Sequence, residues 1–227
     1  MAQSVLVIAD SGTGKSTAIR DLNPDETFII NIANKPLPFK GWKKNYTLIS
    51  KENPKGNLAS SSSAAGIVKA VHHVDQKMPH IKTLVIDDWQ YMSSFEYFDR
   101  ANEKGYDKFT QIAANLAMVA KLPKDLRDDL IVIFLTHSED ATDINGNRKI
   151  KAKTIGKMID NTLTLEGLFS IVLFGKVNKN DDGELEYGFE TQNNGENTCK
   201  SPQGMFEDFF IPNNLQYVKD CIKKYEE

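Results

Sequence analysis

The N-terminal residues contain the feature that most limits how this chain can fold. An apolar run at residues 5–8 leads into the stretch ADSGTGKST at residues 9–17, and a helix-compatible segment follows. Gly12 and Gly14 tolerate backbone angles that other residues resist, so successive N–H groups can turn towards one anion. Strand, glycine-bearing loop and helix in this order predict a phosphate-binding P-loop.

Each position of this loop has an expected role. Lys15 supplies a catalytic positive charge for the β- and γ-phosphates, and the Ser16 hydroxyl is a ligand for Mg²⁺. The residues expected to bind the nucleotide are Asp10, Ser11, Gly12, Thr13, Gly14, Lys15, Ser16 and Thr17. Ala9 stands where the usual pattern has its first glycine, and alanine is the smallest replacement there. The alternative is an ordinary Gly/Ser turn between a strand and a helix.

Composition limits the classes of protein that this chain could belong to. Its 227 residues fit one α/β domain, with a core of about residues 1–178 and a C-terminal strand and helix extension of about residues 179–227. The net charge of −3 gives no overall attraction to nucleic acid or to an anionic membrane, so any DNA contact must be local. The candidates for an arginine finger are few: Arg20, Arg100, Arg127 and Arg148.

The cysteines and the apolar segments point to a compartment. Cys199 and Cys221 lack the spacing of metal ligands, which favours free thiols in a reducing environment. No basic segment precedes the short N-terminal apolar run, and no stretch reaches the length of a membrane span. We therefore expect a cytoplasmic protein with no membrane partner.

Strand and helix patterns alternate along the chain. Apolar runs predict strands at residues 27–32, 83–88, 130–136 and 171–174, with a shorter one at residues 46–49. Helical spacing predicts helices at about residues 59–78, 89–102, 107–123 (with Asp107 as N-cap), 155–168 and 214–225. Residues 185–191 alternate as an antiparallel strand does, and an Asn-Gly turn predicts a hairpin over about residues 142–153. The fold class is α/β, a mostly parallel sheet with helices on both faces and an antiparallel C-terminal edge.

Ligands bind such sheets at the carboxyl ends of the strands, where two further polar groups are expected. Asp87 closes an apolar strand as a Walker B acid does and would hold Mg²⁺ opposite Ser16; its alternative role is a helix N-cap. Asp88 is a candidate general base. His137 follows Thr136 at the end of the next strand and could report γ-phosphate hydrolysis, or it could simply be hydrogen-bonded at the rim. Glu139 is an alternative catalytic acid.

The predicted hairpin concentrates positive charge. It carries Arg148, Lys149, Lys151 and Lys153. These residues could contact a DNA backbone or reach the γ-phosphate bound to a neighbouring subunit. The alternative is a solvated charged hairpin.

The order of these motifs resembles a known family. The P-loop, the strand at residues 83–88, GYD at residues 105–107, LTHSE at residues 135–139 and KTIGKM at residues 153–158 occur in this sequence. The chain resembles the phage-encoded P-loop proteins with a RecA-like core, an AAA-type ATPase group associated with single-strand annealing and recombination. The resemblance covers about residues 4–174.

The resemblance implies a set of properties. They are ATP and Mg²⁺ binding, a RecA-like sheet, a homo-oligomer (ring or filament) with the nucleotide near a subunit interface, and a role with single-stranded DNA or a recombination partner protein in the host cytoplasm. It also makes His137 the sensor, and Lys151 and Lys153 candidates for contacts in trans.

One departure from the family bears on catalysis. RecA-like ATPases usually place a catalytic glutamate after the strand that follows the P-loop helix, but residues 31–35 read NIANK. Either Asp88 or Glu139 substitutes, or hydrolysis is slow and the protein is an ATP-dependent assembly switch for a protein partner. We therefore expect weak ATPase activity.

Two other nucleotide-binding classes fit less well. A nucleotide kinase needs an arginine-rich lid, and Arg148 is the sole arginine in a lid-like position. A GTPase-like switch needs a guanine-reading Asn-Lys-x-Asp stretch after a late strand. Residues 177–181 read VNKND, but a polar turn follows at once.

Overall fold

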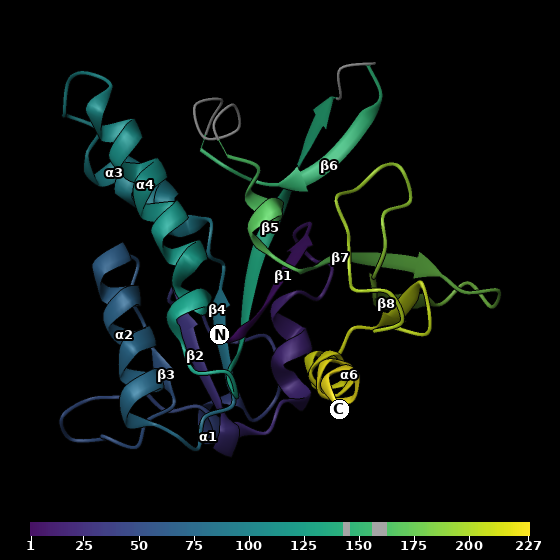
Figure 1. Cartoon of the computed structure of the whole chain (residues 1–227), viewed down its shortest axis with the longest axis horizontal. Helices are drawn as coiled ribbons and strands as arrows, with labels where there is room; N and C mark the ends of the chain where they lie inside the picture. The colour runs from purple at the N-terminus through teal and green to yellow at the C-terminus, as the bar shows by residue number, and fades with distance from the viewer. Residues whose placement is uncertain (143–145, 156–162) are drawn as a thin grey trace.

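The computed structural model describes residues 1–142, 146–155 and 163–227. Within them a single sheet runs through the molecule in the order β3-β2-β4-β5-β1-β7-β8-β9, and β6 pairs with β5 outside this path (Figure 1). The strands are β1 (Gln3–Ala9), β2 (Thr27–Asn31), β3 (Leu58–Ala59), β4 (Thr83–Asp87), β5 (Ile131–Thr142), β6 (Arg148–Ala152), β7 (Ile171–Lys179), β8 (Leu185–Glu190) and β9 (Phe210–Pro212). Strands β1 to β5 and β7 pair in parallel, whereas β6, β8 and β9 are antiparallel, so the predicted fold class is confirmed.

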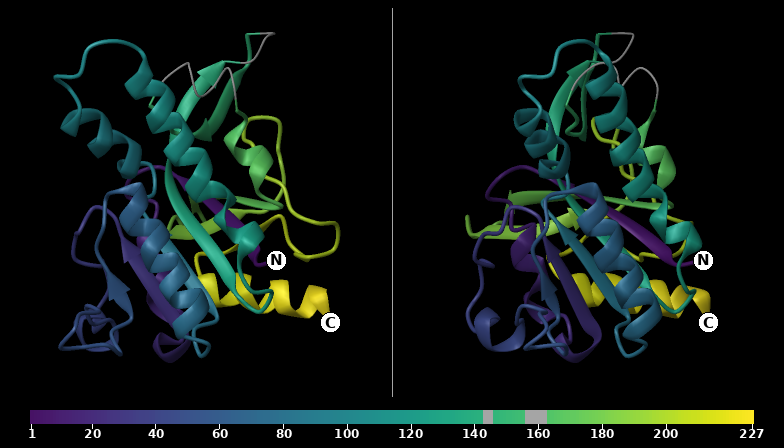
Figure 2. Two further views of the ribbon diagram at one scale, coloured as in Figure 1. Left: turned by 60° about the vertical axis from the view of Figure 1, so that its left-hand side comes forward. Right: turned by 90° about the vertical axis from the view of Figure 1, so that its left-hand side faces the viewer.

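Alternation along β1 explains why helices cover both faces. Leu6 and Ile8 point into one apolar cluster, and Val5 and Val7 point into another on the opposite face. Helices α2 (Ala64–Lys77), α3 (Tyr91–Asp99) and α4 (Asp107–Lys121) pack on the first, while η1 (Ser16–Asp21) and α6 (Leu215–Glu226) pack on the second. Figure 2 shows the two helical layers with the sheet between them. Because both faces of the sheet are covered, every side chain of an apolar strand such as β1 can be buried in one cluster or the other.

Several element boundaries differ from those predicted. Helix α2 begins at Ala64, not at residue 59, because the Ser63 side chain accepts a hydrogen bond from the Gly66 N–H and residues 58–59 form β3. Tyr106 occupies the N-cap position of α4, so the prediction of Asp107 as its cap was wrong. At residues 46–49 only an isolated bridge forms, between Leu48 and Leu58.

The largest difference between a predicted and an observed strand is at β5. We predicted that this strand stops at Thr136, but it continues to Thr142 and pairs Ser138–Thr142 with β6. The hairpin was predicted correctly and begins earlier than expected, because the polar residues after Thr136 extend the strand beyond the core. Its predicted turn residue Asn145, and residues 156–162 of the predicted helix at 155–168, lie outside the described residues.

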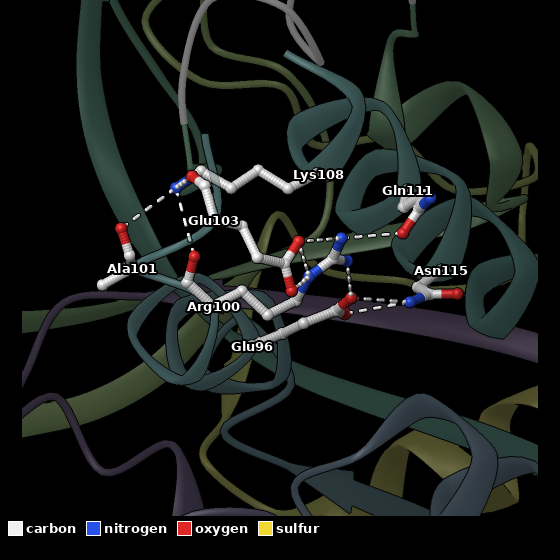
Figure 3. Close-up of polar contacts among 7 residues, drawn as sticks. All are labelled: Glu96, Arg100, Ala101, Glu103, Lys108, Gln111 and Asn115. Atoms are coloured by element: carbon white, nitrogen blue, oxygen red, sulfur yellow. Dashed lines mark hydrogen bonds and ion pairs between the residues drawn. The ribbon is translucent and has the colours of Figure 1, made fainter. Parts of the chain in front are cut away.

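The α3–α4 hairpin is held by a polar network rather than by apolar contacts alone. The Arg100 guanidinium donates to Glu96, Glu103 and Gln111, which joins the end of α3 to α4. The Lys108 ammonium donates to the carbonyls of Arg100, Ala101 and Glu103, which lie in the connection between α3 and α4. Figure 3 shows these contacts together with Asn115, which donates to Glu96. The network therefore joins α3 and the connection after it to α4.

The C-terminal residues join the same sheet. Strands β8 and β9 extend it from β7, and α6 packs against η1, directly after the P-loop (Figure 1). The Asn214 side chain caps α6 by accepting from the N–H groups of Gln216 and Tyr217. Cys199 and Cys221 are free thiols, as predicted. Among the described helices, none combines the length and apolarity that crossing a bilayer requires.

An ion pair between a buried lysine of α6 and Glu26, the residue before β2, generates a prediction. The Lys219 side chain is 2% exposed, and its ammonium donates to Glu26 over 2.9 Å. We expect Glu26→Gln to lower the free energy of unfolding by about 1–3 kcal/mol, because a buried ammonium loses its anion. We expect Lys219→Met, which removes the charge itself, to change stability by less than about 1 kcal/mol.

The pH dependence of this pair follows from the same contact. The hydrogen bond from Lys219 lowers the pKa of Glu26 below its usual 4.5. The stabilisation that the ion pair gives the folded state is therefore fully present above pH 4.5, and it is lost as the pH falls through the lowered pKa of Glu26. Urea unfolding at neutral and acidic pH, with exposed Glu186→Gln as control, measures this. Equal stability of wild type and Glu26→Gln at neutral pH would contradict the assignment.

Candidate functional site

The carboxyl ends of β1, β4 and β5 meet at one cavity of about 910 Å³. Its wall contains these sequence-predicted residues: Asp10, Ser11, Gly12, Gly14, Lys15, Ser16, Thr17, His137 and Lys153. Asp87 and Asp88 lie behind the wall, 2% and 1% exposed. Of the predicted residues that the structure describes, Thr13, Glu139, Arg148 and Lys151 are not part of the wall. The parallel topology thus brings together the groups that the sequence placed at separate strand ends.

The P-loop has the backbone that its glycines predict. Gly12 and Gly14 have φ angles of 84° and 86°, which other residues seldom adopt. The Thr13 hydroxyl donates to the Asp10 carbonyl over 2.8 Å and closes the turn. The helix that follows is the 3₁₀ segment η1, beginning at Ser16 rather than at the predicted Ala18.

The neighbouring strand explains why alanine is accommodated at position 9. Ala9 lies opposite Gly175 of β7 in the parallel pair. A Cβ placed on Gly175 would lie 2.7 Å from the Ala9 Cβ, closer than two carbons approach without a shift. The methyl group that departs from the usual P-loop pattern therefore occupies space left by a glycine across the sheet.

Ser16 and Asp87 form the predicted metal-binding pair. The Ser16 hydroxyl donates to Asp87 Oδ1 over 2.8 Å, across 71 residues of sequence. A hydroxyl and a carboxylate beside the P-loop are the hard oxygen donors that Mg²⁺ prefers, so these residues fit the ion. Burial, and then the charge of Asp88, raise the pKa of Asp87 to about 6. A buried carboxylate of this kind gains from a divalent cation.

Asp88 lies among three cationic or potentially cationic groups. Its Oδ1 is 3.6 Å from Lys15 Nζ and 3.5 Å from His137 Nε2, and its Oδ2 contacts Lys35 Nζ. Burial alone would raise the pKa of Asp88, but the contacts with His137 and Lys35 and the charge of Lys15 outweigh it and hold the pKa below its usual range. Asp88 has a left-handed φ of 59°, and the next residue, Trp89, donates its N–H to the Leu135 carbonyl of β5 over 2.9 Å.

Gln90 fixes the end of β5 beside Asp88. Its Oε1 accepts from the Thr136 hydroxyl and from the His137 N–H, each over 3.2 Å. The His137 ring lies 5.9 Å from the Tyr91 ring in an edge-on arrangement. His137 is therefore held between α3 and Asp88 with its Nε2 towards the site.

The hairpin residues have partners of their own. Arg148 pairs with Asp140 over 2.7 Å, and Lys151 pairs with Glu139 over 3.1 Å across the β5–β6 pair. Lys153 lines the cavity of its own chain, and its N–H donates to the His137 carbonyl over 2.8 Å. The roles of these residues in DNA or trans contacts stay predictions, as does that of Glu139 as a catalytic acid.

Sequence reasoning missed several residues of the wall. They are Lys35, Pro38, Gln90, Tyr91, Ser94, Ser138, Tyr187 and Asn213. Arg20, named from the sequence among the candidate arginine fingers, also belongs to the wall. Lys35 had a signal, because it follows a buried strand as Asp88 does. Asn213 had none: it comes from the chain beyond β9 and lies 3.2 Å from where a Gly14 side chain would begin.

Comparison with known families agrees with this geometry. The family model described as "AAA domain" matches residues 1–203, which include the P-loop, both aspartates, Lys35 and His137. A comparison with curated proteins gives no match. The match supports a P-loop nucleoside triphosphatase with the general ATP and Mg²⁺ requirement of that class.

The Ser16–Asp87 pair predicts how nucleotide binding depends on Mg²⁺. In the wild type we expect Mg²⁺ to strengthen ATP binding. We expect Asp87→Asn to reduce this gain by about 10–100-fold, because an amide cannot replace the carboxylate. Calorimetric titrations with and without Mg²⁺ measure it, and Asp99→Asn on the exposed surface of α3 is the control. An unchanged Mg²⁺ gain in Asp87→Asn would place the metal elsewhere.

Proposed function

The chain belongs to the AAA domain family, and we propose that it binds ATP with Mg²⁺ and hydrolyses it slowly. From the resemblance of its motif order to the phage-encoded group, we propose further that it acts in phage DNA recombination or single-stranded DNA metabolism. The observation that carries the nucleotide part is the Ser16–Asp87 hydrogen bond beside the glycine turns of the P-loop. Lys15 and the loop N–H groups would bind the β- and γ-phosphates. When bound, Mg²⁺ would neutralise charge on these phosphates, held by Ser16 and Asp87.

The surroundings of Asp88 support slow rather than fast hydrolysis. A general base must accept a proton from the attacking water, yet both oxygens of Asp88 are engaged by Lys15, Lys35 or His137. Glu139, the other candidate acid, is paired with Lys151. The strand end that would offer a catalytic glutamate offers Lys35 instead. Two candidate carboxylates are thus paired with cations and a third is absent, so none is free to accept a proton from water.

The basic hairpin is the proposed contact with single-stranded DNA or a neighbouring subunit. Arg148 lies at its exposed end, with its side chain 66% exposed, while Lys153 lies at its base beside the cavity. A contact to the hairpin could therefore be relayed to the nucleotide through β6. A homo-oligomer in the cytoplasm of a phage host, with DNA or a recombination protein as partner, is the part of the proposal that follows from the sequence resemblance alone.

The second candidate is an ATP-dependent assembly switch that binds a protein partner without DNA. The engagement of Asp88 also favours this function, because a switch needs nucleotide binding more than turnover. A small-molecule kinase is less well supported, since Arg20 is the sole arginine among the described residues of the cavity wall.

Turnover measurements separate the proposed function from the alternatives. We expect ATP turnover below about 1 s⁻¹, slower than most enzymes, and stimulation by single-stranded DNA. Lys15→Ala should abolish both, whereas Lys69→Ala on the exposed face of α2 should change neither. Fast turnover without DNA would contradict the proposal. ATP-driven assembly in light scattering, with turnover near zero and no DNA effect, would favour the switch.

A further inference from the structure

Lys35 brings a positive charge to the nucleotide site from a strand end at which an acid was expected. It follows β2, whose last residue Asn31 lies beside Asp87 in the parallel register of β2 and β4. Its ammonium contacts Asp88 Oδ2, and its side chain forms part of the cavity wall. Two lysines, Lys15 and Lys35, therefore flank one buried carboxylate from two separate strand ends.

The backbone around Lys35 is fixed by specific contacts. The Asn31 side chain donates to the Lys35 carbonyl over 2.6 Å and accepts from the Lys35 N–H over 3.3 Å. Asn34 adopts a left-handed φ of 51°, which turns the chain back towards the site. These contacts hold the base of the Lys35 side chain and make its position a consequence of the β2–β4 edge.

The side chain beyond that fixed base can move. Lys35 is 54% exposed, and its ammonium lies 5.9 Å from the centre of the Tyr91 ring. Asp88, by contrast, is buried and directly follows the last residue of β4. A flexible four-carbon stem on a fixed backbone allows the ammonium to exchange one anion for another within the cavity.

Charge decides which anion the ammonium contacts. Lys15 and Lys35 repel each other, and Asp88 is the anion between them when no nucleotide is present. The P-loop brings phosphates to Lys15, so they also come within the reach of Lys35. A terminal phosphate with two charges attracts an ammonium more strongly than one carboxylate does at equal distance.

We propose that Lys35 is a γ-phosphate-recognition residue: it pairs with Asp88 in the nucleotide-free and diphosphate states and moves to the terminal phosphate of a bound nucleoside triphosphate. The proposal rests on the proposed function of the site. It assigns to the chain itself the cation that many ATPases receive from a neighbouring subunit. It also gives the site a means to distinguish ATP from ADP, because ADP lacks the group that draws Lys35 away from Asp88.

The test compares affinities for a non-hydrolysable ATP analogue and for ADP, both with Mg²⁺, in the 227-residue chain. Lys35→Met keeps the apolar stem beside Tyr91 and removes the charge. We expect it to weaken analogue binding about tenfold or more and to change ADP binding by less than about twofold. Lys35→Arg should restore most of the preference for the analogue. Lys40→Ala, an exposed lysine in the same connection, is the matched control and should leave both affinities unchanged.

The outcomes distinguish this inference from the proposed function. If Lys35→Met weakens the binding of the ATP analogue and of ADP equally, Lys35 only stabilises Asp88 or the fold. If both affinities are unchanged, Lys35 does not contact the γ-phosphate. Either result overturns the inference while nucleotide binding by the P-loop stands. If the wild type binds neither ligand, or if Lys15→Ala binds both as the wild type does, the proposed function itself fails and the inference falls with it.

Discussion

The site depends on the contacts between a buried carboxylate at the end of β4 and the positively charged groups around it. Asp88 is 1% exposed, and a charge so far from water is stable only beside opposite charge. The P-loop, the end of β2 and the end of β5 each supply a partner: Lys15, Lys35 and His137. These segments are far apart in sequence, and one carboxylate links them. The same contacts that stabilise the charge also place the groups that phosphates would meet.

The two adjacent aspartates have opposite electrostatic surroundings. Asp87 faces the Ser16 hydroxyl, and its pKa is raised to about 6, whereas the cations around Asp88 hold the pKa of that carboxyl below its usual range. Paired acids whose pKa values are pushed apart typically have different tasks. Asp87 makes a hydrogen bond with a neutral hydroxyl and suits a metal ion as a further partner, whereas Asp88 is already paired with positively charged side chains.

Much of this arrangement could be predicted from the sequence, because continuous apolar strands fix a parallel sheet and a parallel sheet aligns its carboxyl ends. The P-loop, Asp87, Asp88 and His137 were found in this way. Lys35 was missed because a lysine after a strand usually lies in solvent. Its inward position depends on the contacts of its backbone with the Asn31 side chain and on the left-handed Asn34. The extension of β5 past Thr136 was missed because its polar residues pair with β6 outside the core. Asn213 depends on the path of the chain after β9, which no local pattern encodes.

The most direct test of this account is to locate the metal. Mn²⁺ can replace Mg²⁺, and a crystal of the protein with Mn²⁺ and a non-hydrolysable ATP analogue would show it by anomalous scattering. The account predicts one peak at about 2.0–2.2 Å from Ser16 Oγ, next to Asp87 Oδ1 and the phosphates in the P-loop. A metal bound away from Ser16 and Asp87, or a nucleotide bound outside the P-loop, would contradict it.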